Sequence, residues 1–236
     1  PSHIDSVLNS IPNVNFAAGA SRGRFVQIRG IGERSQFAEP INPSVSFIVD
    51  EFDFSGLAAA GLIFDTKQLE VYRGPQATLY GTGALAGAVK LSSNDVGSDA
   101  PDYVEARIGN KESYRIEGAT GDDINTDWGY RVALVHNRSD GFVENTFLNR
   151  SDTANIDETA LRFAVEGSVD ERTTLALTYR WYDIDNGYDA FSLDNDNKTL
   201  SDEPGFDEHQ THAVSARSTT NTAAGDFILI ATHASH

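Results

Sequence analysis

The chain contains neither cysteine nor methionine among its 236 residues. Without cysteine there is no disulfide scaffold and no thiolate metal site, although this absence does not identify a cellular compartment. Without methionine the chain has no start residue of its own.

Long apolar runs are missing as well. No stretch reaches the length of about 18 apolar residues that a membrane-spanning helix needs, and no signal peptide is present, so the sequence predicts no transmembrane helix. One other structure spans lipid, a closed β-barrel, whose alternating strands keep the hydropathy low. The sequence leaves that structure open.

Basic residues are scarce: 18 Lys and Arg stand against 35 Asp and Glu, for a net charge of -17. Such a charge repels nucleic-acid phosphates, so we expect no nucleic-acid partner. Acidic partners are disfavoured for the same reason, whereas cations and neutral ligands remain open. The 39% hydrophobic content and the 20 glycines favour strands and turns over a helical core.

The chain divides into two regions of different character. Residues 1–94 contain short apolar segments separated by Gly, Pro and Asn turns, such as 25–28 and 45–49, and predict a small mixed α/β domain. The polar stretch "DVGSDAPD", residues 95–102, is predicted to be a linker. Residues 103–236 consist of runs in which polar and apolar side chains alternate, which predicts antiparallel β-strands.

We count seven such runs, and their connections carry the more informative pattern. The runs lie near residues 104–108, 114–119, 128–134, 161–166, 175–181, 212–217 and 227–231. An ordinary sheet with one face in water shows the same alternation. Here, however, long polar connections (137–158 and 183–208) alternate with short ones, as in a membrane barrel with one outer and one periplasmic end. Aromatic residues on the apolar faces, Trp128, Tyr130, Tyr179 and Trp181, fit an interfacial girdle.

The stretch "RGPQATLYGTGALAGAVKL", residues 73–91, satisfies a relaxed dinucleotide-binding glycine pattern. That pattern requires a helix of about three turns after the glycines, and the strand predicted at 89–92 leaves no room for one. The stretch instead predicts a tight strand–turn–strand element, because glycine tolerates positive φ and proline fixes its own φ. The expected turn residues are Gly74, Pro75, Gly81, Gly83 and Gly87.

The segment "QLEVYRGPQATLYGTGALAGAVKL" resembles the plug-domain signature of TonB-dependent outer-membrane receptors. "FVQIRGIGERSQF" and "SVSFIVDEF" are similar to two earlier plug elements, and "DWGYRVALVHNRSDGFVEN" to the third barrel strand and second outer loop. The resemblance implies a plug inside a barrel of about 22 strands. The chain would then hold an N-terminally truncated plug (1–94) and the first barrel strands (103–236), without the segment that binds TonB.

The resemblance also implies roles for particular residues. Arg29, Glu70 and Arg73 match plug positions that face the barrel wall through charge-assisted hydrogen bonds, with local solvated pairing as the alternative. Ligand contacts are expected from Tyr80 first. The other expected ligand contacts are Gln76 and the loop residues Arg34, Gln36 and Phe37.

The function that the resemblance implies is TonB-dependent uptake of a scarce nutrient, most often an iron-siderophore complex, across the Gram-negative outer membrane. The alternative is a receptor for glycans or other oligomers. The sequence contains no enzyme motif of the serine-elbow, zincin or cysteine type, so we expect no enzyme and no cofactor apart from iron within a transported chelate.

Two places in the sequence are candidates for metal binding. The stretch 183–203 is rich in aspartate, but Asp194 to Lys198 lacks the glycine and the final glutamate of an EF-hand, which favours a solvated acidic loop. His209 and His212 are too isolated to form a zinc site and are interpreted as strand-end residues. We expect no metal site.

Overall fold

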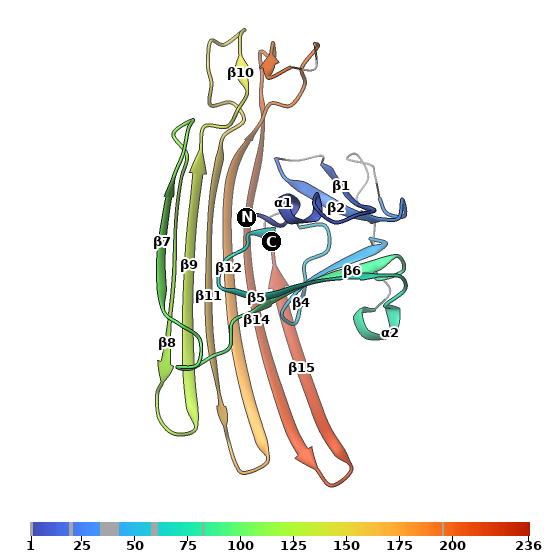
Figure 1. Cartoon of the computed structure of the whole chain (residues 1–236), viewed down its shortest axis with the longest axis vertical. Helices are drawn as coiled ribbons and strands as arrows, with labels where there is room; N and C mark the ends of the chain where they lie inside the picture. Colours follow the sequence, from blue (N-terminus) through green and yellow to red (C-terminus); the bar gives the residue numbers. More distant parts are fainter. Residues whose placement is uncertain (1, 19–20, 34–42, 58–60, 82, 195) are drawn as a thin grey trace.

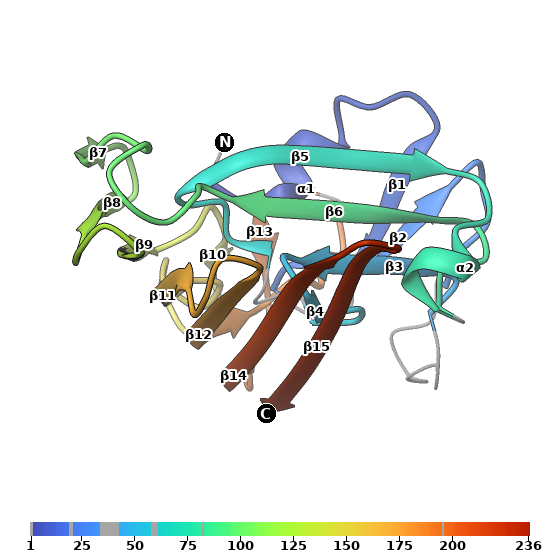
Figure 2. The same cartoon turned by 90° about the horizontal axis from the view of Figure 1, so that it is seen from below.

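The computed structural model describes residues 2–18, 21–33, 43–57, 61–81, 83–194 and 196–236. It contains a tall wall of seven strands and a smaller unit packed against the inner face of that wall (Figure 1). Seen from below, the wall bends in an arc partly around the smaller unit (Figure 2). Within the part of the chain that is described, no helix is long and apolar enough to cross a membrane.

The smaller unit, which we call the plug, mixes two short helices with two small sheets, as expected for a mixed α/β plug. A hairpin pairs β1 (Val14–Ala18) with β2 (Gly23–Ile28). The second sheet has the order β4-β3-β6-β5, with β3 parallel to β6 and the other pairs antiparallel. The remaining elements are α1 (Ile4–Leu8), β3 (Val45–Val49), β4 (Phe52–Asp53), β5 (Thr66–Arg73), α2 (Ala77–Tyr80) and β6 (Gly87–Ser93).

The wall confirms the seven predicted strands, each antiparallel to its neighbours in chain order. They are β7 (Tyr103–Ile108), β8 (Tyr114–Asp123), β9 (Trp128–Ser139), β11 (Ile156–Ser168), β12 (Thr173–Tyr188), β14 (Gly205–Thr222) and β15 (Gly225–Ser235). Several strands are longer than predicted: β12 and β14 extend well into the stretch 183–208, which the sequence suggested to be a loop. Each strand has an apolar band, the part whose outward side chains are apolar. Beyond this band the sequence is mostly polar, so the alternation that predicts a strand is absent there.

The plug and the wall share one apolar core. Phe52 and Phe54 of the plug are buried, and the Phe54 ring meets Tyr182 of β12 edge-on at 5.7 Å between ring centroids. The wall contributes mainly buried alanines to this contact, and their small side chains let the plug approach the wall backbone closely. These alanines are Ala119, Ala133, Ala160 and Ala213.

Long connections lie at one end of the wall and short turns at the other (Figure 1), which confirms the predicted alternation. We call these the loop end and the turn end. The two long connections also contain structure that the sequence did not reveal: β10 (Glu144–Asn145) pairs in parallel with β13 (Lys198–Thr199). The two loops are therefore held together as one unit.

Asp189 corrects the interpretation of the acidic loop as a solvated face. Its buried carboxylate accepts hydrogen bonds from Asn145 and Thr199, each at 2.8 Å, across the two loops. A buried carboxylate with two donors is a structural connection rather than a solvated charge. Among the described residues, no cluster of His, Cys, Asp and Glu could hold a metal ion.

The two candidate zinc ligands lie on opposite faces of β14. Tyr179 contacts His212 on the outward face, with 2.9 Å between the phenol oxygen and the ring nitrogen, while the His209 ring stacks on His236 at 5.8 Å. Both histidines are inside the strand and not at its end, because β14 begins at Gly205. Their positions in a period-2 strand, three residues apart, send the side chains to different sides.

The outward face of the wall allows a direct test of its orientation in lipid. Leu177 lies on this face and is 45% exposed, whereas the next residue, Thr178, lines a polar cavity on the plug side. We expect Leu177→Arg to destabilise the folded receptor by up to about 2–4 kcal/mol, because arginine on the lipid face has a cost that increases toward the bilayer midplane. Folding titrations in lipid vesicles measure this, with Thr178→Arg at the same depth as the control. Equal effects of the two substitutions would contradict the assigned orientation.

Candidate functional site

Three inward-facing arginines form the centre of the contact between wall and plug. Arg131, Arg162 and Arg180 come from β9, β11 and β12, and we call them the arginine triad. Arg162 lies directly opposite Arg180 in the register, while Arg131 lies opposite Ala164, two positions along β11. Like charges in such positions repel each other, so this arrangement requires counter-charges.

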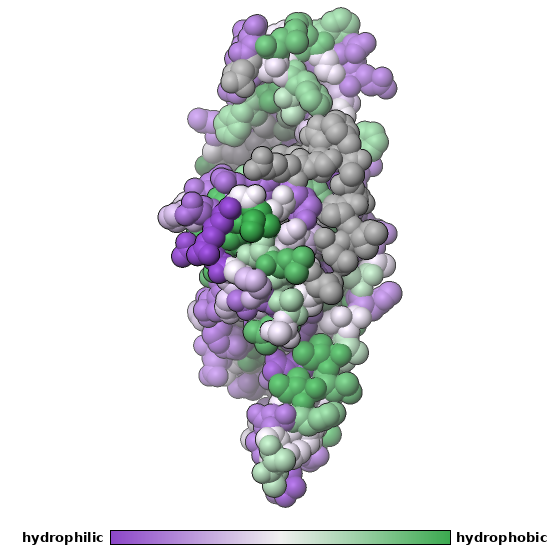
Figure 3. Space-filling model, turned by 90° about the vertical axis from the view of Figure 1, so that its right-hand side faces the viewer, coloured by the Kyte–Doolittle hydropathy of each residue, from purple (hydrophilic) through white to green (hydrophobic). Residues whose placement is uncertain are grey.

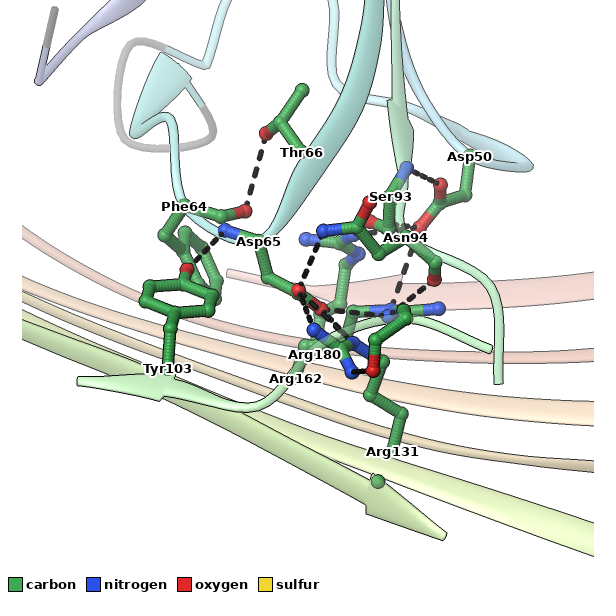
Figure 4. A network of polar contacts seen from close by, with 12 residues as sticks. Asp50, Phe64, Asp65, Thr66, Ser93, Asn94, Tyr103, Arg131, Arg162 and Arg180 are labelled. Atoms are coloured by element: carbon green, nitrogen blue, oxygen red, sulfur yellow. Dashed lines mark hydrogen bonds and ion pairs between the residues drawn. The ribbon is translucent and has the colours of Figure 1, made fainter. Parts of the chain in front are cut away.

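The plug supplies those counter-charges from two turns that directly follow buried apolar segments. Asp50 follows β3 in the tight turn to β4, and Asp65 precedes β5. Both residues have positive φ, 53° and 46° respectively, a conformation that aspartate tolerates better than most residues. The local backbone thereby presents both carboxylates to the wall (Figure 4).

Asp65 receives the larger share of the hydrogen bonds. Arg131 donates to both of its carboxylate oxygens, with 2.6 Å between Nη2 and Oδ1, and Arg162 adds a bond of 3.2 Å. The side chains of Arg131 and Asp65 are both 0% exposed. Asn94 of the plug donates to the same carboxylate at 2.9 Å, and the Tyr103 hydroxyl accepts from the Asp65 backbone N–H at 3.0 Å. Three side chains, Arg131, Arg162 and Asn94, thus donate to one buried carboxylate.

Asp50 forms the second centre of the network. Arg180 Nη2 lies 2.6 Å from Asp50 Oδ2 and also contacts the hydroxyl of Ser93. Ser93 in turn donates its backbone N–H to Asp50 at 2.8 Å. Arg162 approaches the same carboxylate at 3.9 Å and so lies between the two aspartates. Figure 4 shows the three arginines rising from the wall strands to these plug residues.

Nearer the loop end, the polarity of the contact is reversed. Arg22 of the plug holds Glu158 of β11 in a two-pronged pair of 2.6 and 2.7 Å. Asn137 and Asn186 donate to the same carboxylate. Burial by itself would lower the pKa of Arg22, but Glu158 outweighs it and the pKa is raised, so the pair stays charged. Ser21 completes the contact with a hydrogen bond of 2.7 Å to Asp207 of β14.

Two further arginines extend the contact to the flanking strands. Arg115 of β8 donates to the backbone carbonyl of Ile63 at 2.6 Å, and Arg217 of β14 lies 3.7 Å from Glu51. Buried ion pairs add little net stability when complete, yet losing one partner is costly because a charge is then left buried and unpaired. The interface therefore resists partial disruption but contains polar groups that water can solvate once the surfaces separate.

Asp50 gives plug docking a pH dependence of definite sign. Burial by itself would raise its pKa, but Arg180, followed by Arg162, outweighs burial and holds the pKa below the ordinary value of 3.8. The ionised carboxylate therefore stabilises docking above that ordinary value, and this stabilisation disappears as the pH falls through the lower docked-state pKa. We expect the urea midpoint for plug release from the full-length receptor to fall as the pH is lowered from about 5 toward 2.

Glu51 gives plug docking a pH dependence of the opposite sign, so a variant is needed to separate the effects of Asp50 and Glu51. Burial first and the Asp50 charge second raise the pKa of Glu51, and Arg217 offsets only part of this. Protonation of Glu51 therefore favours docking. Asp50→Asn removes the Asp50 contribution and also one of the two causes that raise the pKa of Glu51, so the loss of docking toward low pH should be smaller than in the parent. Superimposable curves would disprove the role given to Asp50.

The structure places the predicted turn residues between β5 and β6, which pair from Arg73 opposite Gly87. The one-turn helix α2 stands between the strands, where the sequence suggested only a turn. Gly81 has φ +79°, which glycine adopts freely. At Gly87 a Cβ atom would lie 2.2 Å from the Tyr72 carbonyl oxygen, so only glycine fits there. Gly74, Pro75 and Gly83 lie in the same connection.

Within the described part of the chain, the three charged plug residues that were predicted to face the wall lie outside the contact between plug and wall. Arg29 is exposed in the turn after β2, with φ 55°. Arg73 is exposed at the end of β5. Glu70 accepts a hydrogen bond of 2.9 Å from Tyr72 on its own strand. None of the three forms an ion pair with the seven described wall strands, and their contact with barrel strands outside this chain stays a prediction.

Tyr80, the first predicted ligand contact, ends α2, and its ring lies 5.8 Å from that of Tyr72. The hydrogen bond with Glu70 first and that with Tyr80 second raise the pKa of Tyr72 to about 12. Figure 1 shows α2 nearer the turn end than the loop end. Gln76 caps the same helix. Arg34, Gln36 and Phe37 lie outside the described residues.

The residues that join plug and wall could have been recognised from two patterns in the sequence. Asp50 and Asp65 each follow a short apolar run, "SFIV" and "LIF", which places a carboxylate at the end of a buried segment. In the wall, five strands each carry an arginine on the polar face. These five are Arg115, Arg131, Arg162, Arg180 and Arg217.

A wall with an apolar outward face and a polar inward face, holding a separately folded unit by buried ion pairs, has the architecture of a plugged β-barrel. Residues 1–88 match the family model described as TonB-dependent Receptor Plug Domain. This match covers less than half of the chain, and together with the relatives below it makes the chain similar to TonB-dependent receptors, as its sequence resemblance implied. The family consists of receptors and not of enzymes.

Relatives support this assignment. The pesticin receptor of Yersinia pestis is 27% identical over 112 residues, which are 47% of this chain and 16% of that receptor. The structure of the ferric yersiniabactin uptake receptor of Y. pestis superposes with a TM-score of 0.83 at 18% identity, over 99% of this chain and 38% of that one. The ferripyoverdine receptor of Pseudomonas aeruginosa gives 0.73 at 16% identity, over 99% and 32%. At these identities the structural likeness shows the fold, and the chain spans well under half of each relative.

Proposed function

We propose that the complete protein takes up a ferric chelate of the siderophore class across the outer membrane, with the plug gating the barrel and TonB providing the energy coupling. One observation carries this proposal: the plug is attached to the wall through a buried but polar interface. The pair Arg131–Asp65 at 2.6 Å and the pair Arg180–Asp50 at 2.6 Å hold it in place. Polar groups at such an interface can exchange their partners for water when the plug moves.

The relatives favour iron chelates over other nutrients. The names of the similar solved structures refer to ferric yersiniabactin and ferripyoverdine. The paired outer loops of this chain carry exposed large apolar side chains, and Figure 3 shows apolar surface at their height. Aromatic side chains at the mouth of a barrel suit a ligand with aromatic or apolar parts. The exposed residues are Phe142, Phe147, Phe191, Leu193 and Leu200.

Uptake of radioactive iron tests the proposal. The full-length receptor is expressed in an iron-starved Gram-negative host without its own siderophore receptors, and ferric chelates are supplied one at a time. We expect uptake of at least one chelate in the host with TonB and none in the isogenic host without it. Oligosaccharide binding without any iron uptake would replace the proposal by a glycan receptor, and uptake that is independent of TonB would remove the energy coupling.

A further inference from the structure

The arginine triad has more positive charge than the plug neutralises. Three guanidinium groups share two carboxylates: Arg131 pairs with Asp65, Arg180 pairs with Asp50, and Arg162 lies between them. Each of these ion pairs joins wall to plug. Among the described residues, no ion pair links the triad to a carboxylate of the wall itself. The triad therefore depends on the plug for its counter-charges.

Arg162 is the member with the weakest pairing. Its side chain is only 7% exposed, yet it lies 3.2 Å from Asp65 and 3.9 Å from Asp50, each of which has a closer arginine partner. Its Nε atom has no hydrogen-bond partner within the described part of the chain. A buried donor without a partner is costly. Arg162 is thus a nearly buried cation with spare capacity to bind an anion.

Space is present beside this residue. A cavity of about 210 Å³ lies between plug and wall, and its lining includes Arg162, Arg217 and Lys90. Carboxylates of Asp50, Glu51, Asp95 and Glu166 line it too, so the cavity is polar and of mixed charge while the plug is docked. When the plug moves, Lys90 leaves with Asp50 and Glu51, and the wall strands keep Arg162 and Arg217 against Glu166, so the balance on the wall becomes positive.

Moving the plug exposes the triad to the lumen without its counter-charges. Arg162 and Arg180 are direct cross-strand neighbours, so their repulsion grows once the aspartates have left. An anion that passes through the lumen relieves this repulsion, whereas a cation increases it. Charged residues with low-dielectric walls around them raise the local concentration of the opposite charge by about 10- to 1000-fold.

We infer that the arginine triad is an anion-binding patch on the path of the transported ligand, and that this ligand is a ferric chelate of net negative charge. The inference rests on the proposed function. It modifies the expectation from the net charge of -17, which disfavours acidic partners for the chain as a whole. At physiological ionic strength charges act over only about 8 Å, so a local arginine patch outweighs distant carboxylates.

The test compares chelates of opposite charge class in the full-length receptor. The probes are ferric citrate and a ferric tris-catecholate, which are anionic, and a neutral ferric trihydroxamate. Arg162→Gln removes the surplus charge and leaves the Arg131–Asp65 and Arg180–Asp50 pairs in place. We expect at least one anionic chelate to be taken up by the parent, and Arg162→Gln to slow that uptake by about tenfold, the lower end of electrostatic focusing.

Controls separate charge from structure. Arg162→Lys keeps the charge and should retain most of the uptake, and Arg172→Gln, the same substitution at an exposed turn residue, should have no effect. Uptake of only the neutral chelate, or an equal loss in Arg162→Gln and Arg162→Lys, overturns the inference while the proposed function stands. If no chelate is taken up by receptor present in the outer membrane, the proposed function fails, and the inference falls with it.

Discussion

Replacing Asp65 by asparagine is expected to loosen the plug by about 3–5 kcal/mol, the usual cost of leaving a buried charge without its partner. The substitution keeps the shape of the side chain, and asparagine tolerates the positive φ of 46° at this position. The change therefore isolates the charge. Arg131, whose side chain is 0% exposed, loses its only carboxylate among the described residues, and Arg162 loses the nearer of two.

The urea midpoint for plug release from the full-length receptor measures this effect. Asp95→Asn provides the matched control, because Asp95 pairs with Lys67 at the surface, where the two side chains are 65% and 53% exposed. Exposed pairs contribute about 0–1 kcal/mol, so this variant should behave like the parent. If both variants shifted the midpoint equally, the buried network could not be what holds the plug.

Much of the fold was predictable from the sequence, because alternation is a local property. All seven wall strands were predicted, as was the alternation of long and short connections. The structural features that the sequence did not predict lie outside the apolar band of the strands. The ends of β12 and β14 and the pairing of β10 with β13 occur in stretches of mostly polar sequence, although Asn145, Asn186 and Thr199 there are buried. There, strands form through backbone hydrogen bonds and leave no pattern of hydropathy.

The site was harder to predict than the fold. Charge-assisted hydrogen bonds join the plug to the seven described wall strands through Arg22, Asp50 and Asp65. Contacts of Arg29, Glu70 and Arg73 with barrel strands outside this chain stay a prediction. Which plug charge meets which wall strand depends on how the two units dock. Asp65 and Arg131 are 66 residues apart, and no local pattern encodes that pairing.

A disulfide between plug and wall is expected to abolish uptake by the complete receptor. Ser21 of the plug and Asp207 of β14 are hydrogen-bonded through their side chains at 2.7 Å, so cysteines at both positions are neighbours across the contact between plug and wall. The chain has no cysteine, so this pair is the only one that can form within it. If ligand passage requires the plug to move away from the wall, oxidation should reduce iron uptake to the level of cells without the receptor, and a reducing agent should restore it.

The matched control crosslinks two wall strands without touching the plug. Thr173 and Thr220 are paired neighbours on β12 and β14, with their hydroxyl oxygens 3.4 Å apart. Thr173→Cys with Thr220→Cys should leave uptake unchanged under the same oxidation, because strands of the wall need not separate for the plug to move. Full uptake through a receptor whose Ser21→Cys and Asp207→Cys pair is quantitatively oxidised would mean that this part of the plug stays docked. Any passage would then have to open nearer the turn end, past the Asp50 and Asp65 contacts.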